Sequence, residues 1–170
     1  VEAAIAHQRH ALTLSPDSDD AHYNLGACLQ ALGQSAEAEA SHRQALALTP
    51  DYLVVHNNLC TTLQHLGRHE EALQVCRRMQ ELGEDNAPLH FNIANSLQAL
   101  RQTEAAKDHF RTALQRDPDY AEAHVNLGSL LQLQGQGEQG MWHIRQALQA
   151  REGHYALAHS NLLFSLSHSD

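Results

Sequence analysis

The sequence predicts an all-α fold in which pairs of antiparallel helices stack into a solenoid. A His-x-Asn-apolar motif recurs every 34 residues, starting at His22, His56, His90 and His124, and appears once more at His159 after 35 residues. Prolines keep the same register at positions 16, 50 and 118. A period of this length indicates a supersecondary unit that stacks on its neighbours because it cannot bury its apolar face alone.

Each unit is predicted to contain two helices. Leu25, Leu29 and Leu32 are spaced four and three residues apart, which is the helical period, and a second apolar stripe runs from Ala38 to Leu48. Turn glycines follow the first helix, at Gly33, Gly67 and Gly135, where a left-handed residue ends a helix. The prolines stop the second helix, and aspartates that favour the next helix start follow at Asp17, Asp51 and Asp119.

The register divides the chain into four complete units with a partial unit at each end. Residues 1–18 are expected to form the second helix of a truncated repeat, and 156–170 the first helix of another, or a capping segment; the complete units are 19–52, 53–86, 87–120 and 121–155. The chain therefore looks like a piece of a longer array. Because Leu162, Leu163 and Leu166 would lack a covering helix, we expect self-association through the exposed repeat ends.

The composition argues against several partners. The chain has 11 basic and 20 acidic residues, a net charge of -9, and no basic stripe for a phosphate backbone, so we expect no nucleic-acid binding. It contains no apolar run of 18 residues, so we expect no membrane insertion. The three cysteines, Cys28, Cys60 and Cys76, fall at core positions of the repeat, which favours a reducing, cytoplasmic location.

The pattern Leu25-Gly26, Leu29, Gly33, Ala38, Ala45 and Pro50 resembles the tetratricopeptide repeat (TPR) over essentially the whole chain. The resemblance implies a right-handed superhelix whose concave wall is lined by the first helix of each unit. It departs locally, since Arg101 replaces a turn glycine and Gly140 replaces the small alanine of a second helix. With Gly135 and Gly137 nearby, the fourth unit is expected to be the least stable, because an interior glycine costs about 1 kcal/mol.

At about 100° per residue, the asparagine of each first helix lies opposite the leucine side that must form the core. This predicts a peptide-binding face made of asparagines and glutamines, namely Asn24, Asn58, Asn92, Asn126, Asn161, Asn95, Gln30, Gln64, Gln98 and Gln132. A carboxamide donates and accepts, so it can hold a peptide main chain whatever the side chains are. In the alternative interpretation these amides bond within the array and only brace the superhelix.

The 14 histidines do not predict a metal site, and we expect no cofactor. The motif histidines of neighbouring units should stand about 10 Å apart, too far to share an ion bound at about 2.1 Å. We expect them instead to fill a partly buried slot, each with one ring nitrogen satisfied by a partner, and to lower stability in acid if they are neutral there. No nucleophile elbow, phosphate loop or isolated carboxylate pair stands outside the repeat, so this chain is not expected to be an enzyme.

The motif His-x-Asn-Leu, with Val54-Val-His-Asn-Asn-Leu-Cys60 as its fullest case, is similar to the TPR region of O-linked N-acetylglucosamine transferases and the related SPINDLY proteins. That resemblance implies the substrate-recognition region of a glycosyltransferase, although no nucleotide-sugar domain is present. The alternative is a stand-alone TPR scaffold or adaptor with no attached enzyme. A receptor for acidic chaperone tails is disfavoured, because Tyr23, Asn57, Phe91 and Val125 occupy the positions where its lysines and arginines would lie.

Overall fold

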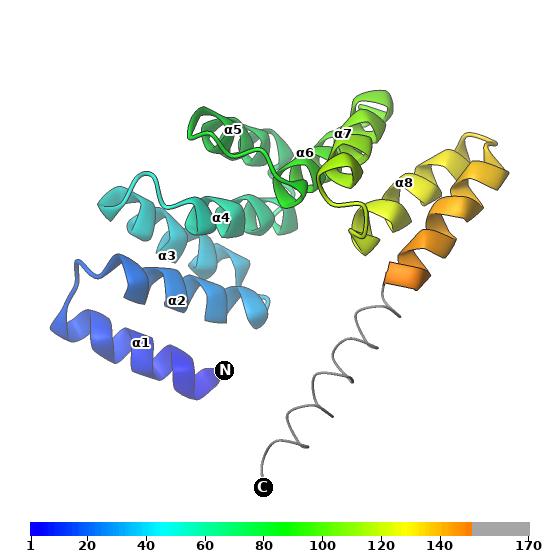
Figure 1. Cartoon of the computed structure of the whole chain (residues 1–170). Coiled ribbons are helices and arrows are strands. Elements are labelled where there is room, and N and C mark those ends of the chain that lie inside the picture. The colour runs from blue at the N-terminus through cyan, green and yellow to red at the C-terminus, as the bar shows by residue number, and fades with distance from the viewer. Residues whose placement is uncertain (151–170) are drawn as a thin grey trace, which may run out of the picture. The chain divides into compact units, whose positions relative to one another are not determined.

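The computed structural model describes residues 1–150 (Figure 1). Over this range the chain is all-α, with sequential antiparallel helix pairs, so the predicted fold class is confirmed. The first helices of the repeats are α2 (Asp19–Ala31), α4 (Leu53–His65), α6 (Ala87–Ala99) and α8 (Ala121–Leu133). The second helices are α1 (Glu2–Leu14), α3 (Ser35–Leu48), α5 (His69–Glu81) and α7 (Thr103–Arg116), and residues 137–150 are helical as well.

The helices form two compact units. The first unit contains residues 1–85 and 95–102, and the second contains 86–94 and the residues from 103 onward, so α6 contributes to both. In the first unit α1, α2, α3, α4 and α5 follow one another as packed neighbours, and α2 also touches α4 (Figure 1). In the second unit α7 packs on α8. The division into repeats at fixed residue boundaries stays a prediction, as do the assignments within 156–170, which lie outside the described residues.

The turns after the helices confirm the predicted left-handed residues. Gly33, Gly67 and Gly135 have φ of 74°, 73° and 79°. Arg101 stands at the equivalent place in the third repeat and adopts φ 63°, a conformation that costs a residue with a Cβ atom about 1 kcal/mol or more. The repeat geometry therefore dictates the turn even where the sequence supplies no glycine.

Large and small residues alternate in the core. Leu25, Leu29, Leu59 and Leu63 of the first helices are buried, and the second helices contribute fully buried alanines at positions 38, 45, 72, 106 and 113. A close approach lies between α2 and α3, where a Cβ atom on Gly26 would come within 2.5 Å of the His42 ring. His42 is fully buried, and its two ring nitrogens have no hydrogen-bond partner. A polar ring thus fills a position that belongs to the apolar core.

Candidate functional site

The amides predicted to bind peptide lie at one register, the sixth residue of each first helix. We call this the amide face: Asn24, Asn58, Asn92 and Asn126, with Gln30, Gln64, Gln98 and Gln132 further along the same helices. Asn24 is exposed, Asn58 and Asn126 are half-buried, and Asn92 is only 7% exposed. Because α2 touches α4, Asn24 and Asn58 lie on neighbouring helices of one unit. The predicted asparagines therefore share one register of their helices, and they differ in how exposed they are.

The remaining residues of the predicted site also differ in exposure. Gln30 and Asn95 are half-buried, whereas Gln98 and Gln132 are exposed. Gln64 donates a hydrogen bond from Nε2 to Ser96 Oγ at 2.9 Å, so it joins α4 to the end of α6 within the first unit. A hydrogen bond of this kind, between two helices of the array, is what the alternative interpretation expects, in which the amides brace the superhelix. Asn161 lies outside the described residues.

Three of the motif histidines fasten their first helices to the segments before them. The Nε2 atoms of His22, His56 and His124 lie 3.0, 2.8 and 2.9 Å from the carbonyl oxygens of Pro16, Pro50 and Pro118. His90 Nδ1 instead lies 2.9 Å from Nδ1 of His109. The prediction that one ring nitrogen of each motif histidine has a partner is confirmed for these four. Because the bonds of His22, His56 and His124 tie these three helices to the preceding turn, they also help to position the asparagine two residues later in each of them.

Aromatic pairs accompany the amide face, and the sequence reasoning did not identify them. Tyr23 and Tyr52 have ring centroids 5.6 Å apart, and Phe91 and Tyr120 have centroids 5.1 Å apart, so residues 29 positions apart meet in both units. The Tyr52 hydroxyl donates to Asp20 Oδ1 at 3.0 Å, which raises the pKa of Tyr52. A pocket of about 460 Å³ opens beside Tyr52. A search of the sequence for aromatic residues 29 positions apart would have found both pairs.

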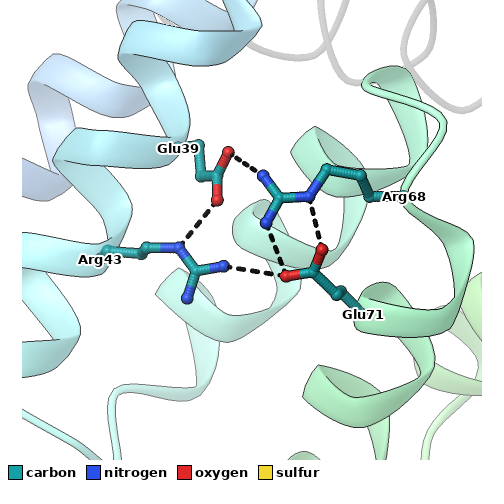
Figure 2. Close-up of polar contacts among 4 residues, drawn as sticks. All are labelled: Glu39, Arg43, Arg68 and Glu71. Atoms are coloured by element: carbon teal, nitrogen blue, oxygen red, sulfur yellow. Dashed lines mark hydrogen bonds and ion pairs between the residues drawn. The ribbon is translucent and has the colours of Figure 1, made fainter.

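Charge is segregated between the two kinds of helix. The four first helices contain Asp19, Asp20 and Glu122 and no lysine or arginine. The basic residues of the described range lie on the second helices and in the turns. Figure 2 shows two of these basic residues, Arg43 and Arg68, bonded to carboxylates. Arg68 donates to both carboxylate oxygens of Glu71 at 2.6 Å and to Glu39 at 2.6 Å. Arg43 donates to Glu39 at 2.8 Å. The first helices therefore present amides, aromatics and acids.

The histidines whose pKa values are lowered in the folded chain are not the motif histidines predicted from the sequence. Burial lowers the pKa of His42 from 6.5 to about 4. Burial, followed by the proximity of His124, lowers the pKa of His143 to about 4, and burial together with His90 lowers the pKa of His109. All three belong to second helices, at positions that face the preceding first helix.

Within residues 1–150, no group of three or more histidine, cysteine, aspartate or glutamate side chains gathers in a way that could hold a metal ion. Over the same range no helix is both long and apolar enough to cross a membrane.

The chain belongs to the tetratricopeptide repeat family. Three profiles of that family match residues 8–40, 53–78 and 97–162, which together make up more than half of the chain. No curated protein sequence matches it significantly.

Solved TPR structures resemble the fold closely. The chain matches MamA from Desulfovibrio magneticus RS-1 with a TM-score of 0.78 and 16% identity, over 89% of this chain and 86% of that one. It matches TTC0263, a thermophilic TPR protein of Thermus thermophilus, with 0.75 and 24%, over 88% and 82%. It also matches YrrB, described as a TPR protein with an unusual peptide-binding site, with 0.68 and 23%, over 94% and 82%. At these identities the likeness establishes the fold.

Proposed function

We propose that this chain is a protein-interaction module that binds an extended polypeptide along the amide face. The observation that carries the proposal is an asparagine at the same register of all four first helices. Asparagine is a mediocre helix former, and four in mid-helix are not required by the apolar core. A shared binding task explains the repetition, because an amide can bond the carbonyl and N–H groups of any main chain.

The spacing supports a peptide in extended conformation. Packed helices stand about 10 Å apart, and an extended chain advances about 3.3 Å per residue, so Asn24 and Asn58, on the touching helices α2 and α4 of the first unit, would meet about every third residue of the ligand. The pairs Tyr23–Tyr52 and Phe91–Tyr120 add aromatic contacts beside the amides, which favours apolar or aromatic ligand side chains between the bonded residues.

The charges of the first helices indicate what the peptide carries. Three acidic residues and no basic one lie on these helices, at their amino-terminal ends. An acidic tail would meet like charge there, whereas a neutral or basic segment would not. We therefore expect ligands poor in aspartate and glutamate.

The solved structures named above are TPR proteins, and none of those three is described as a glycosyltransferase. They favour a stand-alone scaffold over the substrate-recognition region of an O-linked N-acetylglucosamine transferase. YrrB is described as having a peptide-binding site, which supports polypeptide as the ligand class. The glycosyltransferase interpretation keeps one support, the His-x-Asn-Leu motif, in which His56 and His124, two residues before their asparagines, bond a proline carbonyl. The mass of the native polypeptide in its source distinguishes the two interpretations, because an attached glycosyltransferase domain would make the polypeptide much larger.

The test uses peptides selected against the native chain from a random library. Replacing Asn24, Asn58 and Asn126 together by alanine should weaken unrelated selected peptides alike, because the lost bonds are to main chain. At about 0.5 to 1.5 kcal/mol for each neutral hydrogen bond, the triple change should cost roughly 2 to 4 kcal/mol of binding free energy, or about 30-fold to 1000-fold in Kd. The helices should still form, since alanine is the better helix former.

Asn92 provides the matched control. Since the Asn92 side chain is only 7% exposed, little of its amide is open to a ligand. Asn92→Ala should therefore lower the melting temperature clearly and raise the Kd of the selected peptides only slightly. If the triple variant binds every selected peptide as tightly as the native chain, the amide face does not bind peptide. If the triple variant loses its melting transition together with binding, the amides brace the fold instead.

A further inference from the structure

Two buried thiols meet between α4 and α5. The Sγ atoms of Cys60 and Cys76 lie 3.2 Å apart and share a hydrogen bond, although the two residues are 16 positions apart in the chain. Cys60 is fully buried, and Cys76 is only 1% exposed. Both belong to the first unit, in which α4 and α5 are packed neighbours, so the contact depends on a single helix pair.

The repeat brings its two helices close together at this register. The residues equivalent to Cys60 in the other repeats are small, namely Gly26, Ala94 and Gly128. A Cβ atom on Gly26 would come within 2.5 Å of the His42 ring, and one on Gly128 would come within 2.9 Å of the Gly140 carbonyl oxygen. A disulfide requires such an approach, because it joins residues whose Cα atoms are only about 5.5 to 6 Å apart.

The two thiols need little movement to become bonded. The S–S bond of a disulfide is about 2.05 Å long, so the sulfur atoms of Cys60 and Cys76 would approach each other by about 1.2 Å. Each sulfur ends a short side chain that rotates about its Cα–Cβ bond. The helix backbones can therefore stay close to their present positions while the bond forms.

We propose that Cys60 and Cys76 form a reversible disulfide when a peroxide oxidises the chain, and that this bond locks α4 to α5. One thiol, as its thiolate, attacks a peroxide oxygen, and the O–O bond breaks to give a sulfenic acid and hydroxide. The second thiol then attacks the sulfenic sulfur, the S–O bond breaks, and water leaves with the proton of that thiol. The hydroxide takes the proton that the first thiol released, so two thiols and one hydrogen peroxide give one disulfide and two water molecules.

Burial sets the pace of the reaction. The hydrogen bond with Cys76, together with burial, raises the pKa of the Cys60 thiol, so little thiolate exists in the folded chain. Oxidation therefore proceeds when the α4–α5 pair opens locally and admits the peroxide, and the bond forms as the helices close. Once formed, the bond opposes later openings, because the two helices can no longer separate at this register.

The test treats the native chain with hydrogen peroxide, alkylates the remaining thiols, and maps the digested peptides by mass spectrometry. The peptides of Cys60 and Cys76 should be recovered cross-linked, with a loss of about 2 Da for two hydrogen atoms, and dithiothreitol should reverse the change. The half-buried Cys28 provides the matched control. Cys28→Ser should form the same cross-link, and the repeat accepts serine there, because Ser96 stands at the equivalent position.

Urea unfolding measures the lock itself. A disulfide that closes a loop of 16 residues should lower the unfolding equilibrium constant of the oxidised chain on the order of 100-fold. Peroxide should give no such gain in Cys76→Val, nor in Cys60→Ala, which serves if the valine variant folds poorly. An equal gain in these variants would overturn the proposal. So would Cys60 and Cys76 that stay unlinked, as thiols or as sulfinic acids, after Cys28 has been oxidised.

Discussion

Replacement of His42 by phenylalanine should raise stability and remove much of the chain's sensitivity to mild acid. His42 is fully buried against Gly26, and neither of its ring nitrogens has a hydrogen-bond partner. Phe110 occupies the equivalent place 68 residues later and is also fully buried, and Ala94 stands there at the register of Gly26. Since the repeat accommodates a phenyl ring where an alanine takes the glycine's place, it should accommodate one here.

The sign of the pH effect follows from the lowered pKa. Burial lowers the pKa of folded His42 from 6.5 to about 4, so between those values the unfolded chain binds the proton and the folded chain does not. The free energy of unfolding therefore falls as the pH drops below 6.5. For this residue the loss between pH 7.5 and 5.5 is about 1 kcal/mol, and it grows to about 3 kcal/mol below pH 4.

Urea unfolding followed by far-ultraviolet circular dichroism measures both effects. The native chain should lose at least about 1 kcal/mol between pH 7.5 and 5.5, and His42→Phe should recover about that amount. At pH 7.5 the variant should gain about 1 to 3 kcal/mol, the cost of leaving a buried polar group without a partner. An equal dependence on pH in the two proteins, or a variant less stable at pH 7.5, would show that the ring is solvated or that its nitrogens have partners.

Two further substitutions test the turn and the close approach. Arg101→Gly should stabilise the chain by about 0.5 to 1 kcal/mol, because φ 63° is unfavourable for arginine and free for glycine; a lower urea midpoint would mean that the arginine side chain contributes more than its backbone costs. Gly26→Ala should destabilise by about 1 to 3 kcal/mol, because the new Cβ atom would lie within 2.5 Å of the His42 ring. Gly137→Ala, with no atom near its added methyl group, is the control and should not destabilise, so equal losses in the two glycine variants would refute the packing argument.

The features that the sequence predicted well are those repeated in every unit. A 34-residue period, apolar spacings of three and four, and glycines after each first helix are local signals that packing reinforces, and the helix pairs and left-handed turns follow them. The bonds of His22, His56 and His124 to the proline carbonyls were foreseen in kind, because a polar ring in a partly buried slot must find a partner.

The features that escaped prediction depend on pairs of positions in different helices. The accessibility of the asparagines is not encoded by their register, because neighbouring side chains leave Asn24 exposed and Asn92 only 7% exposed. The contacts of His90 with His109 and of His124 with His143 were missed, because the motif histidines were compared only with one another across repeats, about 10 Å apart. The relevant neighbour lies within the same repeat, 19 residues along the chain, and only the antiparallel return of the second helix brings it to 2.8 Å.

Equivalent positions in a repeat protein reveal which residues the fold requires and which it leaves free. The position facing Gly26 holds His42, and its equivalents are Cys76, Phe110 and Ile144, so the fold requires a side chain there but not a particular chemistry. The position of Asn24 holds asparagine in each first helix although its burial varies from exposed to 7% exposed. Packing alone would let the residue type vary, as it does at the first position, where His42, Cys76 and Phe110 are all buried. Because the asparagine does not vary, packing alone does not account for it, and the polypeptide ligand that we propose for the amide face would supply the missing demand.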